Sequence, residues 1–157
     1  MAQPPEGTLP PLPVHRGLLQ MPTDLRGLTQ VLDWFGQFNQ PPLNYQAWWQ
    51  CQLSLDEGFT NAVRHAHAAL PPETLIEIVV KIYPTWMEME IWDQGPWFDL
   101  ENHLTNLGEG PADPEQEGGR GLLLIRTFMD HVRYVRAEDT RNCLVMQKCF
   151  AGDGGQQ

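Results

Sequence analysis

The stretch Glu57-Gly-Phe-Thr-Asn61-Ala-Val-Arg-His65 places polar residues on a strongly apolar helical pattern, the best defined in this chain. The pattern predicts a helix over residues 45–70, and Asn44 is a suitable N-cap for it. The apolar stripe of this helix consists of Trp48, Cys51, Leu55, Phe59, Ala62 and Ala66. At about 100° per residue, Glu57, Asn61 and His65 line up away from the centre of that stripe.

The spacing of Glu57 and Asn61 has a possible chemical use. Residues at i and i+4 lie side by side on a helix, so the two side chains would present oxygens to the same space. Magnesium takes one or two protein oxygens and completes its octahedron with water and phosphate. A glutamate beside it could accept a proton from an attacking hydroxyl. An ordinary solvated helix face explains the same spacing, so this pair is ambiguous by itself.

A second segment, Trp92-Asp93-Gln-Gly95-Pro-Trp97-Phe-Asp99, follows directly on an apolar run that predicts a strand. A carboxylate at the end of a strand can accept a hydrogen bond from the exocyclic amine of adenine. Gly95 would let a flat base approach the backbone without a Cβ in the way. The alternative is an ordinary Asp-Gln-Gly turn.

A third segment, Glu117-Gly-Gly119-Arg120-Gly121-Leu-Leu-Leu, precedes a predicted helix over residues 121–129. Backbone N–H groups at a helix start favour anions, and an arginine adds charge-assisted bonds to phosphate oxygens. The segment is neither a Walker A loop nor a Rossmann fingerprint, because it lacks their spacing and context. A flexible hinge is the alternative.

The remaining pattern predicts an α+β fold, a two-layer sandwich with a mixed, mostly antiparallel sheet and helices on one face. Strands are expected at residues 15–21, 74–82, 86–92, 131–136 and 143–150. A first helix is expected to begin after Thr23-Asp24, and residues 100–116 are expected to form a long loop. One domain would cover residues 14–150, between a proline-rich tail (1–13) and a polar tail (151–157).

Composition narrows the class of partner and the compartment. The 157 residues carry 20 acidic and 10 basic side chains, a formal charge of −10, which disfavours direct nucleic-acid binding. No apolar run approaches the roughly 20 residues of a membrane span, and the proline-rich start does not resemble a signal peptide. The three cysteines have no zinc-like spacing and are expected to be reduced core thiols. We therefore expect a cytoplasmic protein without membrane contact.

Taken together, the three segments resemble the motifs of the GHKL (Bergerat-fold) ATPase superfamily, in particular the anti-sigma factor serine/threonine kinases of the RsbW and SpoIIAB type. Residues 56–66 resemble the N box, residues 92–99 the D-x-G-x-G box, and residues 118–130 the final glycine box. The segment 18–25 also resembles the strand and helix start that open these proteins. The resemblance covers roughly residues 14–150.

The resemblance implies an ATP site with Mg²⁺, with Asn61 as the magnesium ligand and Glu57 as the catalytic base. Asp93 would bind adenine and Gly95 would border the base, while residues 100–116 would form the lid over ATP. The residues implied at the phosphates are Gly119, Arg120 and Gly121, and His65 matches the N box without a definite role. The second glycine of the D-x-G-x-G box is replaced by Trp97. Trp97 could stack on the nucleotide, fold outward or narrow the pocket.

The resemblance also implies partners and an activity: a homodimeric kinase that phosphorylates a serine or threonine of a STAS-type anti-anti-sigma protein. The second partner would be a sigma factor, whose release by partner switching regulates transcription. Trp97 motivates an alternative, a module that sequesters a protein without useful catalysis. The ATP-binding half of a histidine kinase is a third reading, which the absence of a predicted dimerisation helix pair disfavours.

Overall fold

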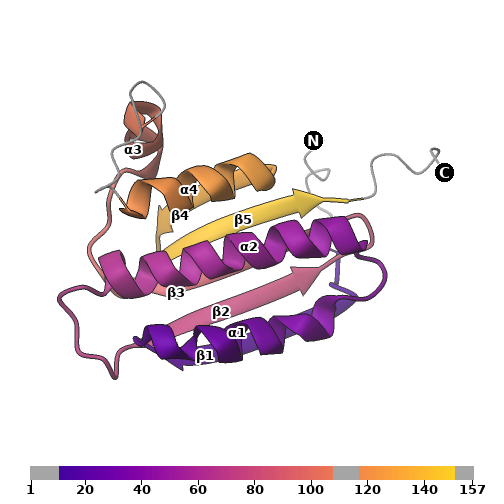
Figure 1. The fold of residues 1–157 in the computed structure, drawn as a ribbon, viewed down its shortest axis with the longest axis horizontal. Coiled ribbons are helices and arrows are strands. Elements are labelled where there is room, and N and C mark those ends of the chain that lie inside the picture. The colour runs from indigo at the N-terminus through magenta and orange to yellow at the C-terminus, as the bar shows by residue number, and fades with distance from the viewer. Residues whose placement is uncertain (1–10, 108–116, 151–157) are drawn as a thin grey trace.

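A five-stranded antiparallel sheet with the strand order β1-β2-β3-β5-β4 forms one layer, and the helices cover one of its faces (Figure 1). This computed structural model describes residues 11–107 and 117–150. The strands are β1 (His15–Pro22), β2 (Leu75–Ile82), β3 (Trp86–Asp93), β4 (His131–Arg136) and β5 (Asn142–Cys149). The α-helices are α1 (Leu28–Phe35), α2 (Tyr45–Asn61), α3 (Leu100–Leu107) and α4 (Glu117–Phe128). Shorter helical turns are η1 (Leu25–Gly27), η2 (Gly36–Phe38) and η3 (Ala62–Ala66).

The α+β class and the single helical layer are confirmed. All pairings of the five described strands are antiparallel, so the sheet is not mixed. Hairpins join β2 to β3 and β4 to β5, and antiparallel strands can be connected by such short turns. No helix in the described segments is long and apolar enough to cross a membrane.

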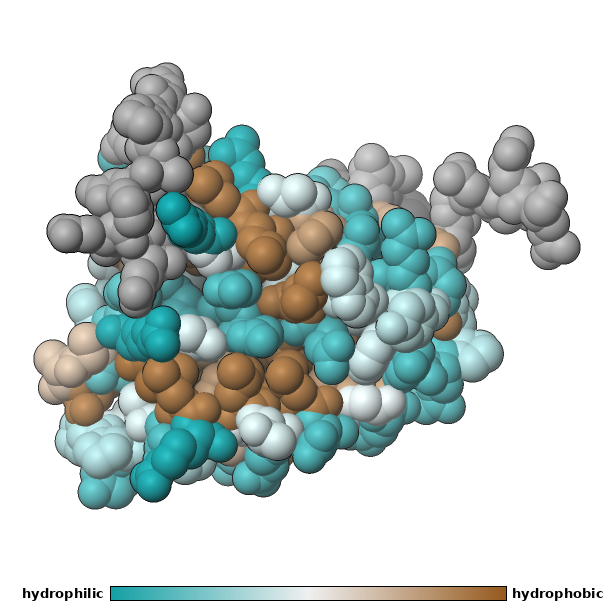
Figure 2. All heavy atoms as spheres, in the orientation of Figure 1, coloured by the Kyte–Doolittle hydropathy of each residue, from teal (hydrophilic) through white to brown (hydrophobic). Residues whose placement is uncertain are grey.

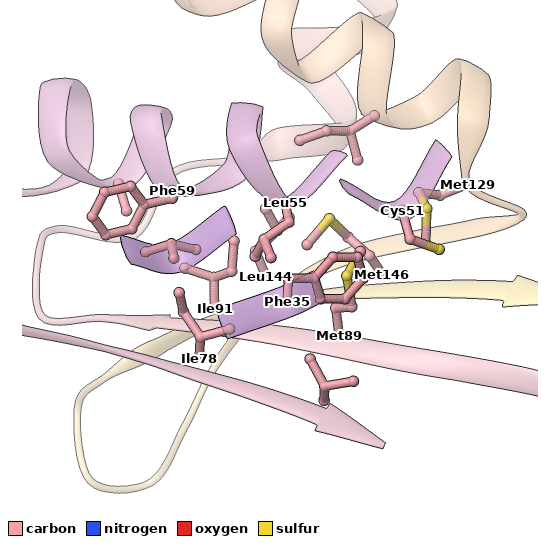
Figure 3. Close-up of a cluster of buried hydrophobic side chains, with 14 of the residues drawn as sticks. Phe35, Cys51, Leu55, Phe59, Ile78, Met89, Ile91, Met129, Leu144 and Met146 are labelled. Carbon is pink, nitrogen blue, oxygen red and sulfur yellow. The ribbon is translucent and has the colours of Figure 1, made fainter. Parts of the chain in front are cut away.

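The core lies between the helices and the helix-facing side of the sheet (Figure 3). Alternate residues of β2 and β3 point into it, as the two-residue period of a strand requires. Its largest fully buried members include Phe35, Leu55, Phe59, Ile78, Met89, Ile91 and Met146. In Figure 2, hydrophobic residues lie on both sides of the polar outer surface of α2, where neighbouring helices pack against it.

Both predicted caps are present. The Asp24 carboxylate accepts a hydrogen bond from the Arg26 N–H at 2.9 Å, at the start of η1. The Asn44 side chain accepts one from the Ala47 N–H at 2.8 Å, at the start of α2. Each cap satisfies a backbone donor that the first helical turn leaves without a partner.

The predicted helix over residues 45–70 is wrong in its second part. α2 ends at Asn61, and the chain continues as the single π-helical turn η3. The His67 N–H donates to the Ala62 carbonyl at 2.9 Å, which is the i to i−5 bond of a π-helix. Ala62 and Ala66 of the predicted apolar stripe are still buried, and His67, directly after the turn, is buried as well.

Two further expectations about the third segment are wrong. Residues 100–107 form helix α3 rather than loop, with Leu100 and Leu104 buried one turn apart. Residues 108–116 lie outside the described part of the chain. α4 begins at Glu117, so Gly119, Arg120 and Gly121 belong to its first turns rather than preceding it. Glycine is a poor helix former, which is why the sequence placed the start too late.

The cysteines were predicted to be core thiols, which holds for Cys51 and Cys143 only. Both are buried, and burial raises the pKa of each thiol, that of Cys51 to about 12. Cys149 is exposed because it ends β5 on the solvent side. All three thiols are free, so none is held in a disulfide.

Candidate functional site

The C-terminal part of α2 lies beside the start of α4, which brings the first and third segments together (Figure 1). A Cβ built on Gly121 would lie 2.5 Å from Oε2 of Glu57. A side chain at position 121 would displace the flexible end of Glu57, so glycine there lets the Glu57 carboxylate lie against α4. The glycine cluster therefore positions a carboxylate as well as starting a helix.

The environment of Glu57 suits a proton acceptor. Burial raises the pKa of its carboxyl group above the usual value, the negative charge of Asp56 raises it further, and Arg64 lowers it. A carboxylate with a raised pKa holds a proton more strongly, so it is a better base near neutral pH than an exposed glutamate. The direction of the shift agrees with the role implied by the resemblance.

Asn61, the last residue of α2, lines a small cavity between the helices and the end of β3. The cavity measures about 10 Å³. Its other lining residues are Gly58, Ala62, Ile91, Asp93, Phe98, Leu100, Leu122, Tyr134 and Leu144. Pockets that hold small molecules typically enclose about 300–1,000 Å³. The site therefore brings Asn61 and Asp93 together, but side chains must move before a nucleotide base can enter.

Asp93 is only 3% exposed, and both of its carboxylate oxygens already accept hydrogen bonds. Oδ1 accepts from the Gly95 N–H and from the Asn142 side-chain amide, each at 2.9 Å. Oδ2 accepts from the Tyr134 hydroxyl at 2.6 Å. A carboxylate has about four acceptor positions, so Asp93 retains capacity for a further donor. An incoming amine would nevertheless meet Tyr134 beside it.

Tyr134 and Asn142 are functional candidates that the sequence did not indicate. Asn142 is paired with Asp93 across β3 and β5, and Tyr134 comes from the outer strand β4. Burial raises the pKa of the Tyr134 hydroxyl, and its hydrogen bond to Asp93 raises it further, so the hydroxyl stays protonated and remains a donor. Strand register brings these three residues together, and register is not visible in a single sequence.

Gly95 is required by its neighbours in the protein. A Cβ at this position would overlap the carbonyl oxygen of Ala66 in η3. The Gly95 carbonyl in turn accepts a hydrogen bond from the Asn142 amide at 2.7 Å. The turn after β3 is thus clamped between η3 and β5, which fixes where Asp93 lies.

Phe98, the neighbour of Trp97, lines the cavity near Asp93, where the sequence led us to expect Trp97. Trp97 is 49% exposed and is not among the residues that line the cavity, whereas Phe98 lines it. The Phe98 ring packs on the Tyr134 ring with centroids 4.8 Å apart. Trp97 therefore does not narrow this cavity, which Phe98 and Tyr134 line instead.

The remaining candidates lie at the edge of this site. Arg120 is exposed in the first turns of α4, and Gly119 contributes backbone there. His65 lies in η3 with an exposed side chain. Within residues 11–107 and 117–150, no three His, Cys, Asp or Glu side chains gather as a metal site. The donors near Asn61 therefore fit Mg²⁺ only if phosphates and water supply most of its ligands.

Comparison with known proteins agrees with this architecture. Residues 21–148 match the family described as histidine kinase-like ATPase domain. The serine-protein kinase RsbW of Staphylococcus epidermidis is 29% identical over 124 residues, covering 68% of this chain and 78% of the relative. The RsbW of Staphylococcus aureus strain MRSA252 is 28% identical over the same length and coverage.

A solved structure gives the same result for the fold. The crystal structure of the RsbU and RsbW domains of Rv1364c from Mycobacterium tuberculosis superposes with a TM-score of 0.61 at 11% sequence identity. The match covers 87% of this chain and 32% of that one, so this chain spans about a third of the solved protein's length. At this identity the likeness concerns the fold alone.

Proposed function

Because this chain belongs to the histidine kinase-like ATPase family, we propose that it is a serine/threonine protein kinase that uses Mg-ATP to phosphorylate a STAS-type antagonist. The contact of Glu57 with Gly121 carries this proposal, since it places a carboxylate of raised pKa against the start of α4. Two of the similar proteins are named serine-protein kinases, which supports the same reaction class.

The residues of the site have distinct roles in this proposal. Glu57 accepts the proton of the attacking serine or threonine hydroxyl, and the first turns of α4 present N–H groups to phosphate oxygens. Arg120 adds positive charge there, and Asn61 offers a neutral oxygen to the metal. Mg-ATP supplies the phosphoryl group and part of the charge neutralisation. Phosphoryl transfer depends mainly on such positioning and electrostatic stabilisation.

Recognition of the base falls to Asp93 in this proposal. Its carboxylate accepts a hydrogen bond from the adenine amine, and Gly95 keeps the turn beside it close to η3. The cavity of about 10 Å³ must enlarge for this, and Phe98 and Tyr134 are the side chains that close it together. Movement of these two aromatic rings therefore accompanies nucleotide binding.

The partners we propose are a sigma factor and its STAS-type anti-anti-sigma protein, exchanged according to phosphorylation state in the cytoplasm. A homodimer is part of the same proposal. The formal charge of −10 favours basic protein surfaces as partners and disfavours nucleic acid.

A second function is favoured by one observation, the occupied state of the adenine site. Tyr134 donates a hydrogen bond to Asp93 at 2.6 Å and lines the small cavity together with Phe98, as expected for a module that sequesters a partner without using ATP. The two functions differ in one measurable respect, which is whether phosphate leaves ATP for the partner.

The test is a transfer assay with the full chain, γ-labelled ATP, Mg²⁺ and the STAS protein captured with it from its native cells. A kinase labels a serine or threonine of that partner, and omission of Mg²⁺ removes the label. A partner that binds tightly but stays unlabelled, with ATP also bound, contradicts the kinase and supports sequestration.

A further inference from the structure

His67 stands directly after η3 and is the one histidine that the structure buries, with 1% of its surface exposed. Both of its ring nitrogens have partners. Nδ1 lies 2.7 Å from Oγ1 of Thr23, and Nε2 accepts a hydrogen bond from the Gln94 N–H at 2.8 Å. The ring thus connects the end of β1 to the turn that follows β3.

The two partners determine the state of the ring. The Thr23 hydroxyl donates to the Thr74 carbonyl at 2.6 Å, so toward His67 its oxygen acts as acceptor and Nδ1 carries the hydrogen. A backbone N–H can only donate, so Nε2 must be unprotonated. His67 is therefore neutral in one tautomer, and a second proton would place two N–H groups against each other at Gln94.

The hydrogen bond from the Gln94 N–H to His67 matters because of where Gln94 lies in the chain. Gln94 separates Asp93, the adenine candidate, from Gly95, which fits against Ala66 without room for a Cβ. Ala66 and His67 are consecutive, so the end of η3 holds this turn at two adjacent points. One is a steric fit that does not depend on pH, and the other is a hydrogen bond that does.

The surroundings of His67 favour the neutral ring. Burial lowers its pKa below the ordinary histidine value, and the negative charge of Asp93 at the end of β3 raises it by less. Beyond Thr23, the partly exposed carboxylate of Asp24 is paired with Arg26 at 2.8 Å. The contacts from β1 and from the turn itself are with a neutral hydroxyl and a backbone amide.

We propose that His67 is a positioning residue for nucleotide recognition: its neutral ring holds Gln94, and through Gln94 the carboxylate of Asp93. Protonation of the ring breaks that bond and loosens the turn. The proposal rests on the proposed function in so far as Asp93 binds adenine. The hold of His67 on the turn is independent of any nucleotide.

The pH dependence has a definite sign. Where the turn is released, the ring takes up a proton near the ordinary pKa of about 6.5, whereas the held ring resists protonation down to a lower pH. The hold is therefore complete above about pH 6.5, weakens as the pH falls below that value, and is lost as the pH falls through the lower pKa of the held ring. Nucleotide affinity should fall in the same window, by about threefold to tenfold for one lost hydrogen bond.

Two variants separate the hydrogen bond of His67 to Thr23 from its hydrogen bond to Gln94. His67→Gln keeps an acceptor for the Gln94 N–H and does not titrate. His67→Asn keeps a donor for Thr23 but is too short to reach Gln94. The measurements, on the full chain from pH 5.5 to 8, are ATP affinity by calorimetry and the exchange protection of the Gln94 amide by NMR.

The expected result is that the native protein progressively loses both Gln94 protection and ATP affinity as the pH falls below about 6.5. His67→Gln should keep both, and His67→Asn should be weak at every pH. The same acid loss in His67→Gln as in the native protein would overturn the proposal, as would an Nε2–H tautomer in the NMR spectrum. If no ATP binds at any pH, the proposed function fails, and Gln94 protection that does not follow pH would overturn the hold itself.

Discussion

At Asp93, the carboxylate expected to read adenine is already held by Gly95, Asn142 and Tyr134. Two of these partners, Gly95 and Asn142, fix the orientation of the side chain. The third, Tyr134, competes with a ligand, because its hydroxyl lies on the oxygen that is otherwise unshared. Replacing Tyr134 therefore removes the group that competes with adenine and leaves the two that orient the Asp93 carboxylate.

Tyr134→Phe should strengthen ATP binding by about twofold to tenfold, because the base no longer displaces a hydrogen bond. The same change should lower the free energy of unfolding by about 1 kcal/mol, since Asp93 loses a donor. Calorimetry and urea unfolding measure the two effects. Tyr83→Phe is the matched control, as its ring stacks on Trp86 away from this site. Weaker ATP binding in Tyr134→Phe would mean that the hydroxyl assists the nucleotide.

Asn61 is the residue on which the metal assignment depends. Asn61→Ala should leave stability nearly unchanged, because alanine suits the last position of α2, and should abolish the part of ATP affinity that requires Mg²⁺. Calorimetric titrations with Mg²⁺ and with a chelator measure this for both proteins. Equal affinity of the native protein under the two conditions would remove Asn61 from the role of metal ligand.

Among the elements, the packing of α2 against α4 joins the two helices that carry the proposed phosphate site. Gly121 permits the close approach to Glu57, whereas Gly36 in η2 has open space around its Cβ position. The two glycines can therefore be compared by mutation: an added Cβ would meet Glu57 at position 121 and no atom at position 36.

Gly121→Ala should displace the Glu57 carboxylate and greatly reduce phosphate transfer while changing stability little. The displaced atom ends a flexible side chain, and alanine favours the helix by about 0.5–1 kcal/mol over glycine. Gly36→Ala, the control, should keep full transfer. Labelled-ATP assays with unfolding curves test the pair, and normal transfer in Gly121→Ala would show that this contact is dispensable.

The turn η3 shows what helix periodicity did not indicate in this segment. A 3.6-residue period aligns His65 with Asn61, and the sequence offered no sign that the helix would widen there. His65 is exposed, on the side where the period placed it, whereas His67, directly after the π-turn, is buried against Thr23 and Gln94. The sequence therefore predicted the apolar stripe of this segment, but not the burial of His67.

Across the whole molecule, the sequence predicted the caps, the strands and the meeting of α2 with α4, but not the strand register around Asp93. The Asn44 cap, the strand at residues 86–92 and the meeting of α2 with α4 followed from caps, periodicity and the three segments. Tyr134 and Asn142 reach Asp93 only through the register of β3, β5 and β4. Such contacts join residues more than forty positions apart, which one sequence does not reveal.

The central claim is that this fold transfers phosphate with Glu57 as the base, and one comparison tests it. Native protein, Glu57→Gln and the control Asp33→Asn, whose side chain is exposed on α1, are each measured for ATP affinity and for transfer of labelled phosphate to the STAS partner. Loss of a general base typically costs about 10²–10⁴ in rate. We predict that loss in Glu57→Gln alone, with ATP affinity retained in all three proteins. Transfer by Glu57→Gln at the native rate would contradict the account.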